Sequence, residues 1–208
     1  MKKIFALAAL AAASVTASAA TNLFANGSFE AISQADGTWN TYTAVPGWTV
    51  TQANFLPSSH GLEIRDNVAG TAQDGLNFIE LDGYENDRIT TSFATTVGQT
   101  YQISFWYQNR AGVGAASEGF DATVLSGSGV SAASLVGNAP SNAWLQEKII
   151  FTADSTISTF SIAATGTSDG YGTSFDNFNA IAVPEPATMG LFAAGLAMLG
   201  LSARRRRS

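Results

Sequence analysis

The sequence predicts an all-β fold, an antiparallel β-sandwich or barrel, with one helix on each side of it. Three observations support this prediction. Residues 21–182 consist of short segments in which apolar and polar residues alternate, a pattern typical of half-buried strands. Turn signals rich in Gly and Asp separate the segments, and no helical period of apolar residues runs through them. At both ends of the chain the alternation gives way to an uncharged apolar run.

The first segment, residues 1–20, has the composition of a secretory signal peptide. Two lysines follow Met1, an apolar run extends from Ile4 to Ala13, and small residues in an Ala-x-Ala pattern close the segment. We therefore expect an N-terminal signal helix that is removed before Ala20 or Thr21. The alternative is a buried helix of the domain, but an alanine-rich run without polar periodicity argues against it.

Seven alternating runs form the predicted strands. The clearest is Tyr101–Gln108, in which every second residue is apolar or aromatic and the residues between them are polar, except for Trp106. The other predicted strands are Leu76–Leu81, Ile89–Thr95, Phe120–Leu125, Leu145–Phe151, Ile157–Ala163 and Phe175–Ala182. Two runs of small residues, Gly112–Ser117 and Ser126–Ser134, are predicted to be flexible loops. Many short strands at this spacing favour a sandwich or a barrel.

The last segment, residues 183–208, predicts a membrane-spanning tail. An uncharged run of seventeen residues, Ala187–Ala203, follows a Pro-Glu-Pro sequence. At a rise of about 1.5 Å per residue it would span roughly 26 Å, the short end of what a bilayer core requires. The chain closes on Arg204, Arg205, Arg206 and Arg207. Because basic residues stay in the cytoplasm, the tail would place the rest of the chain outside the inner membrane, in agreement with the signal peptide.

Charge and cysteine content limit the partners of the region between the two ends. Residues 21–183 contain four basic and fifteen acidic residues, a net charge of −11, and the chain has no cysteine. Such a domain should repel nucleic acid and anionic lipid, and its carboxylates are available to bind a divalent cation. Without disulfides, its stability must come from the core.

Several short motifs resemble the galactose-binding-like jelly rolls, the fold of many carbohydrate-binding modules. They are Asn26-Gly27-Ser28-Phe29-Glu30 in a predicted opening strand, Pro46-Gly47-Trp48, and Phe175-Asp176-Asn177-Phe178 near the close. The resemblance implies one structural calcium ion that ties the first strand to the last, with Glu30 and Asp176 at the matching positions. Alternatively, both are ordinary surface or capping carboxylates.

The tail resembles the PEP-CTERM sorting signal of Gram-negative bacteria, in which a Pro-Glu-Pro motif precedes a short apolar helix and terminal arginines. Pro184, Glu185 and Pro186 match that motif residue by residue. The resemblance implies recognition by an exosortase and an association with exopolysaccharide and biofilm. It also implies a protein held in the inner membrane before sorting and found at the cell surface or in the extracellular matrix afterwards.

Trp106 is the candidate contact for a ligand of the exported domain. Strand alternation places it with Gln102 and Gln108 on one face, opposite the apolar face of the same strand. An indole ring among amides offers a sugar a flat apolar platform and polar groups for its hydroxyls. The alternative is that a loop or a second layer covers this face, so that Trp106 is part of a core.

Catalysis finds little support in the sequence. The single histidine, His60, is not accompanied by a nucleophile motif, and one histidine cannot supply the usual zinc site. The acidic cluster Asp82, Glu85 and Asp87 is better explained as a hairpin turn. We therefore expect a non-catalytic protein that associates with exopolysaccharide. The rivals are a structural matrix protein without a specific ligand and, less favoured, a glycoside hydrolase, which would need two carboxylates around the scissile bond.

Overall fold

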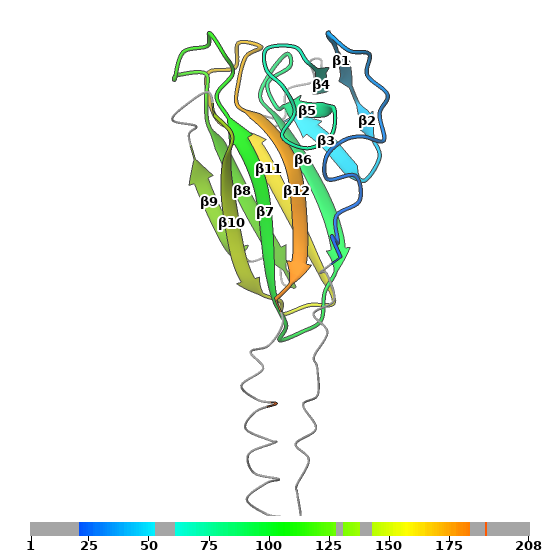
Figure 1. Cartoon of the computed structure of the whole chain (residues 1–208). Coiled ribbons are helices and arrows are strands. Elements are labelled where there is room, and N and C mark those ends of the chain that lie inside the picture. The colour runs from blue at the N-terminus through cyan, green and yellow to red at the C-terminus, as the bar shows by residue number, and fades with distance from the viewer. Residues whose placement is uncertain (1–20, 53–60, 128–130, 138–142, 184–189, 191–208) are drawn as a thin grey trace, which may run out of the picture.

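The protein is described by a computed structural model that places residues 21–52, 61–127, 131–137, 143–183 and 190. These residues form two six-stranded sheets packed face to face, with antiparallel pairing throughout (Figure 1). In spatial order, sheet A contains β1 (Thr38–Tyr42), β4 (Leu62–Asp66), β5 (Asn77–Glu80), β12 (Ser174–Ala182), β7 (Thr100–Gln108) and β10 (Leu145–Thr152). Sheet B contains β2 (Ala44–Val45), β3 (Trp48–Gln52), β6 (Asp87–Ala94), β11 (Ile157–Ala164), β8 (Phe120–Ser126) and β9 (Ser131–Gly137). The predicted antiparallel β-sandwich is confirmed.

All seven predicted strands are present, with ends within two residues of the predicted ones, as β5, β6, β7, β8, β10, β11 and β12. Three expectations were wrong. Strand β9 begins inside the stretch predicted to be a small-residue loop, because its backbone pairs with β8 from Ser131 onward. The predicted opening strand consists of turns, because Asn26 and Phe29 have left-handed backbones with φ of 55° and 60°. The Asp82–Asp87 turn is not a hairpin, since it connects β5 of sheet A to β6 of sheet B.

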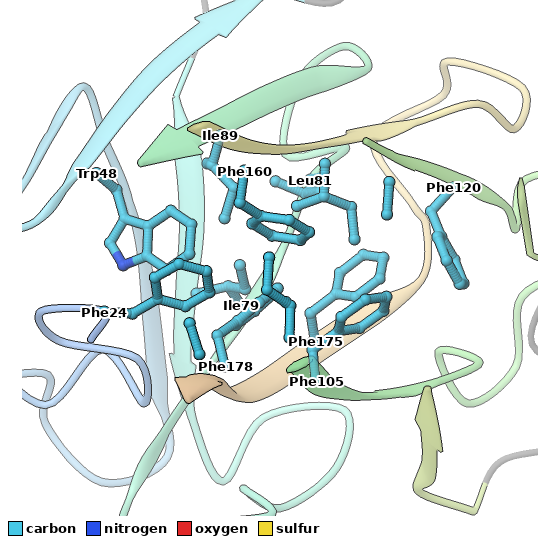
Figure 2. Close-up of a cluster of buried hydrophobic side chains, with 14 of the residues drawn as sticks. Phe24, Trp48, Ile79, Leu81, Ile89, Phe105, Phe120, Phe160, Phe175 and Phe178 are labelled. Carbon is cyan, nitrogen blue, oxygen red and sulfur yellow. The ribbon is translucent and has the colours of Figure 1, made fainter. Parts of the chain in front are cut away.

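The core between the sheets is rich in aromatic rings, which explains how a domain without disulfides holds together. Phe105 of β7 stacks on Phe178 of β12 with ring centroids 5.5 Å apart, and Phe178 meets Trp48 of β3 edge-on at 5.2 Å (Figure 2). Such ring pairs add to the stabilisation from buried apolar area. The turns near the N-terminus take part, because Phe24 and Phe29 are both buried in this cluster.

The two ends of the sandwich carry different connections. At one end lie the β7–β8 and β11–β12 loops, residues 109–119 and 165–173. The opposite end carries the β6–β7 and β10–β11 turns and the last residues of β12 (Figure 1). The β4–β5 connection, residues 67–76, folds back over the outward face of sheet A, where Gln73 and Asp74 donate backbone hydrogen bonds to Asp176 of β12.

Several predictions concern parts of the chain outside the described residues. These are the signal segment 1–20, His60, the sorting motif 184–186, the arginine cluster 204–207 and, apart from Gly190, the helix predicted for 187–203. Within the part of the chain that the structure places, no helix is long and apolar enough to cross a bilayer.

Candidate functional site

The outward face of sheet A brings together the residues predicted to bind a ligand. Gln102, Trp106 and Gln108 alternate along β7 with the buried Ile103, Phe105 and Tyr107. In the ladder, Trp106 stands between Asp176 of β12 and Gln146 of β10. Trp106 and Gln102 are half-buried and Gln146 is exposed, so this part of the face is open to solvent.

The neighbouring part of the same face is covered. Gln108 is 6% exposed, and its Nε2 atom lies 3.1 Å from the place where a Cβ atom on Gly70 would be. The indole of Trp144, just before β10, donates a hydrogen bond to the Thr71 carbonyl, and its ring meets Phe78 edge-on. The 67–76 loop therefore covers Gln108 and Phe78, and the border between covered and open surface runs beside Trp106. Among the three predicted residues, Gln108 is the one without free access to a ligand.

On the same face of sheet A, beside the Phe78 ring, lies a network of four charged side chains that the sequence did not predict. Arg65 of β4 forms ion pairs with Glu63 and with Glu80 of β5, and all three are at most 3% exposed. Arg110 reaches in from the β7–β8 loop, and its Nη1 atom lies 2.8 Å from Glu80 Oε1. Burial raises the pKa of Glu80 to about 7, although both guanidinium groups act in the opposite direction.

The exposed side of Arg110 belongs to a pocket of about 450 Å³ between the end loops. Its guanidinium lies 4.7 Å from the centroid of the Tyr171 ring, which is 49% exposed. Ser117 donates a 2.7 Å hydrogen bond to Asp169 on the same wall. A half-exposed ring, a guanidinium, a hydroxyl and a carboxylate together can hold a small polar ring. The Gly112–Ser117 segment, predicted to be only a connection, supplies part of this lining.

Glu30 and Asp176, the predicted calcium ligands, both bind the loop that covers sheet A. Glu30 Oε1 accepts hydrogen bonds from the amides of Leu76 and Asn77, at 2.8 and 2.7 Å. Asp176 Oδ2 accepts from the amides of Gln73 and Asp74, at 2.7 and 2.8 Å. Gly75 allows this approach, since a Cβ there would lie 2.4 Å from Glu30 Oε1 and its φ is 72°.

These contacts fit a calcium ion in part. Glu30 and Asp176 come from opposite ends of the domain's sequence, yet both contact residues 73–77, as a shared ion would require. Within the described residues, however, no group of three or more acidic or histidine side chains forms a metal cluster. The amide hydrogens already fasten the loop to both carboxylates. Burial raises the pKa of Asp176 to about 7 against the effect of these amides, and a nearby cation would favour its ionised form.

Asp82 and Asp87, from the acidic turn, are fully buried. Asp82 Oδ2 accepts a hydrogen bond from the Asp169 amide at 3.1 Å, and Asp87 Oδ2 accepts one from the Gly61 amide at 2.9 Å. Burial, followed by the charges of Asp82 and Glu85, raises the pKa of Asp87 to about 7. Because their carboxylates point into the protein, Asp82 and Asp87 stabilise the ends of the turn and do not face a substrate.

The C-terminal segment has a recognisable counterpart among known proteins. A family described as the PEP-CTERM protein-sorting motif matches residues 182–207. The chain carries a PEP-CTERM sorting motif. This motif indicates an exported protein sorted to the cell surface, and it begins within the last residues of β12, so that it directly adjoins the sandwich. No curated protein matches the chain in sequence.

The sandwich that precedes the PEP-CTERM motif resembles solved carbohydrate-binding modules in fold. A family 16 carbohydrate-binding module-2 superposes with a TM-score of 0.50 and 15% identity, over 77% of this chain and 99% of that one. An arabinose-bound α-L-arabinofuranosidase gives 0.52 at 15% identity, over 77% of this chain but only 26% of the enzyme. A module in complex with β-1,4-galactotriose gives 0.48 at 17% identity, over 78% and 99% of the two chains. The first two superpositions support the jelly roll as the fold class of the sandwich.

Proposed function

We propose that this protein is a non-catalytic carbohydrate-binding protein of the cell surface or extracellular matrix, which associates with exopolysaccharide. Before sorting, its tail holds it in the inner membrane, where an exosortase processes the Pro-Glu-Pro motif. The observation that carries the binding part is the open strip around Trp106. There a half-exposed indole stands in a row with Gln146, beside Gln102, on β7, which is paired on both sides with β12 and β10. Sugars bind to such surfaces by stacking on the ring while polar groups orient their hydroxyls.

The loop pocket supplies a second contact area for the same function. Tyr171 presents about half of its surface, and the guanidinium behind it fixes the orientation of the ring. Among the described lining residues, Asp169 is the only carboxylate. Since a glycosidase of the usual kind needs two carboxylates around the scissile bond, the pocket favours binding over hydrolysis.

Binding of the soluble domain, residues 21–183, to the producer's own exopolysaccharide tests the proposal. We expect Trp106→Ala to weaken binding severalfold, and to cost less stability than the about 3–5 kcal/mol of a fully buried tryptophan, because its ring is only half-buried. Tyr171→Ala examines the loop pocket in the same assay. Tyr84→Ala is the matched control, since Tyr84 is 55% exposed and belongs to neither area.

The outcomes separate the rival functions. Loss of binding in the Trp106 variant alone assigns the ligand to sheet A, and loss in the Tyr171 variant alone assigns it to the pocket. If the unmodified domain binds neither this polysaccharide nor any sugar on a glycan array, the protein is a structural matrix component and the proposal fails. Release of sugar from the polysaccharide would make it an enzyme.

The membrane stage has its own test. A reporter fused after Ser208 should behave as cytoplasmic, and one fused at Val183 as periplasmic, because the four arginines retain the C-terminus in the cytoplasm. The opposite pattern would contradict the proposed topology and would leave the carbohydrate-binding part untouched.

A further inference from the structure

The end of the sandwich from which the tail departs exposes two large apolar side chains. Val97, in the β6–β7 turn, is 61% exposed, and Ile157, at the start of β11, is 60% exposed. The β6–β7 and β10–β11 turns at this end comprise residues 95–99 and 153–156, and Asp154 is the only charged residue of these two turns. Exposed branched side chains of this size on an almost uncharged surface favour a partner that is itself apolar.

Backbone hydrogen bonds hold this tip in place. The amide of Thr95 donates to the Thr156 carbonyl at 2.9 Å, and the amide of Gly98 donates to Ala153 at 2.7 Å. In return, the Ala153 amide donates to the Gln99 carbonyl at 3.0 Å. The two turns therefore form one unit, and Val97 projects from a fixed platform.

The chain that leads to the sorting motif is fastened to the same platform. The Val183 amide donates to the Thr100 carbonyl at 2.9 Å, and the Gln99 side chain donates from Nε2 to the Val183 carbonyl at 2.7 Å. Only Pro184, Glu185 and Pro186 separate Val183 from the uncharged run that begins at Ala187. Even fully extended, the chain from Val183 to Ala187 covers no more than about 14 Å.

Because this connection is short, the tail end of the sandwich must lie next to the membrane. The polar layer between the bilayer core and water is about 5–8 Å thick on each side. A domain tied within about 14 Å of that core has no room to turn its tail end away from the membrane. The opposite end carries the half-buried Glu85 and the exposed Asp169 in its loops, and anionic headgroups would repel these two carboxylates.

We propose that, in the unprocessed protein, the tail end of the sandwich rests on the lipid bilayer, with Val97 and Ile157 in the interfacial layer. The inference rests on the membrane stage proposed above. In this position the loop pocket and its acidic surroundings are directed away from the membrane, and the Pro-Glu-Pro motif lies at the membrane surface. The partner is the phospholipid surface itself, through its uncharged interfacial region.

The absence of cysteine from the chain makes single-cysteine labelling a clean test. The full chain is reconstituted in phosphatidylcholine vesicles with a fluorescent probe at Val97→Cys or Ile157→Cys. The matched control is Tyr84→Cys, because Tyr84 lies in the turn after β5 and is itself 55% exposed. A nitroxide on the lipid headgroup should quench the probes at positions 97 and 157 severalfold more than the probe at 84. Equal quenching at the three positions would overturn the proposal.

A fourth probe, at Ala194→Cys in the middle of the predicted span, separates two kinds of failure. Quenching of this probe by an acyl-chain nitroxide, with no excess quenching at 97, would refute the resting position alone. No quenching at 194 would refute the membrane stage, and the present inference with it. If the probe at 97 becomes shielded as the protein concentration rises in detergent without lipid quencher, the tip binds a second copy and the bilayer contact is wrong.

Discussion

The two sheets present outward faces of opposite character, although both follow the same alternation along their strands. On sheet A, the outward side chains of β4, β5 and β12 include charged and aromatic residues that are buried, namely Glu63, Arg65, Phe78, Glu80 and Asp176. On sheet B, the outward side chains of β6 and β11 are mostly hydroxyls, such as Thr90, Ser92 and Thr159, and they remain half-buried or exposed. There, Ser92 and Thr159 bond across the strands at 2.9 Å.

The difference shows that alternation decides on which face of the sheet a side chain lies, whereas a covering loop decides whether that face is buried or exposed to solvent. A covered face must satisfy its charges internally, as Arg65 and Glu80 do. An open face leaves hydroxyls that exchange hydrogen bonds with water at little gain or cost. Trp106 lies at the border between the covered and the open parts of sheet A, which is why a binding surface is expected there.

The largest effect that would test this contrast is expected from Glu80→Ala. Without Glu80, the buried guanidinium of Arg65 keeps only one ion-pair partner, Glu63 of the same strand. The loss should lower the free energy of unfolding by about 3–5 kcal/mol. Thr90→Ala, on the open face of sheet B, should stay within about 0.5 kcal/mol. Urea unfolding of both variants measures the difference. Equal costs would show that the covered network contributes no more than the hydroxyl face.

A second test asks whether burial alone, without a network, has a comparable effect. Burial raises the pKa of Asp87 from its ordinary 3.8 to about 7. Because the folded state then binds the proton more tightly than the unfolded state, the stabilisation is complete below about pH 4 and is lost as the pH rises to about 7. Three pKa units correspond to at most about 4 kcal/mol.

Asp87→Asn is the variant for this test, since its amide oxygen can still accept the Gly61 hydrogen bond. We expect the variant to be more stable than the unmodified protein at pH 8 and close to it at pH 4. Thermal unfolding across this range provides the measurement. A constant offset between the two curves would contradict the raised pKa.

The smallest effect concerns the loop that makes the two faces differ. If Glu30 and Asp176 share a calcium ion, the folded domain gains roughly 2.7 kcal/mol at a hundredfold excess of calcium over its dissociation constant. A chelator should then lower the melting temperature, and Glu30→Gln should abolish the response while it keeps the bonds to Leu76 and Asn77. A melting curve that ignores the chelator would mean that the amides alone hold the loop.

The fold and the candidate site differ in how much of them follows from sequence. Long alternating strands such as Tyr101–Gln108 were predictable, because their period is local and strong. Strand β4, Leu62–Asp66, also alternates, but its charged positions suggest an exposed face and conceal the buried network. The burial of these charges depends on tertiary contacts with Phe78, Ser174 and Arg110, and nothing local in the sequence of β4 indicates them. For the same reason the openness of Trp106 and the burial of Gln108 could not be predicted. The tail motif needed no tertiary information at all.

The position of β12 has a consequence for the order of events during export. This strand is the last one among the described residues, yet it lies between β5 and β7 inside sheet A, and it brings Phe175 and Phe178 to the core. Sheet A therefore cannot close until residues 174–182 have left the translocation channel, and the sorting motif comes directly behind them. Non-local pairing of this kind forms slowly, so the chain remains unfolded while it passes through the translocation channel. In the proposed topology, completion of the sandwich coincides with the arrival of the tail in the bilayer.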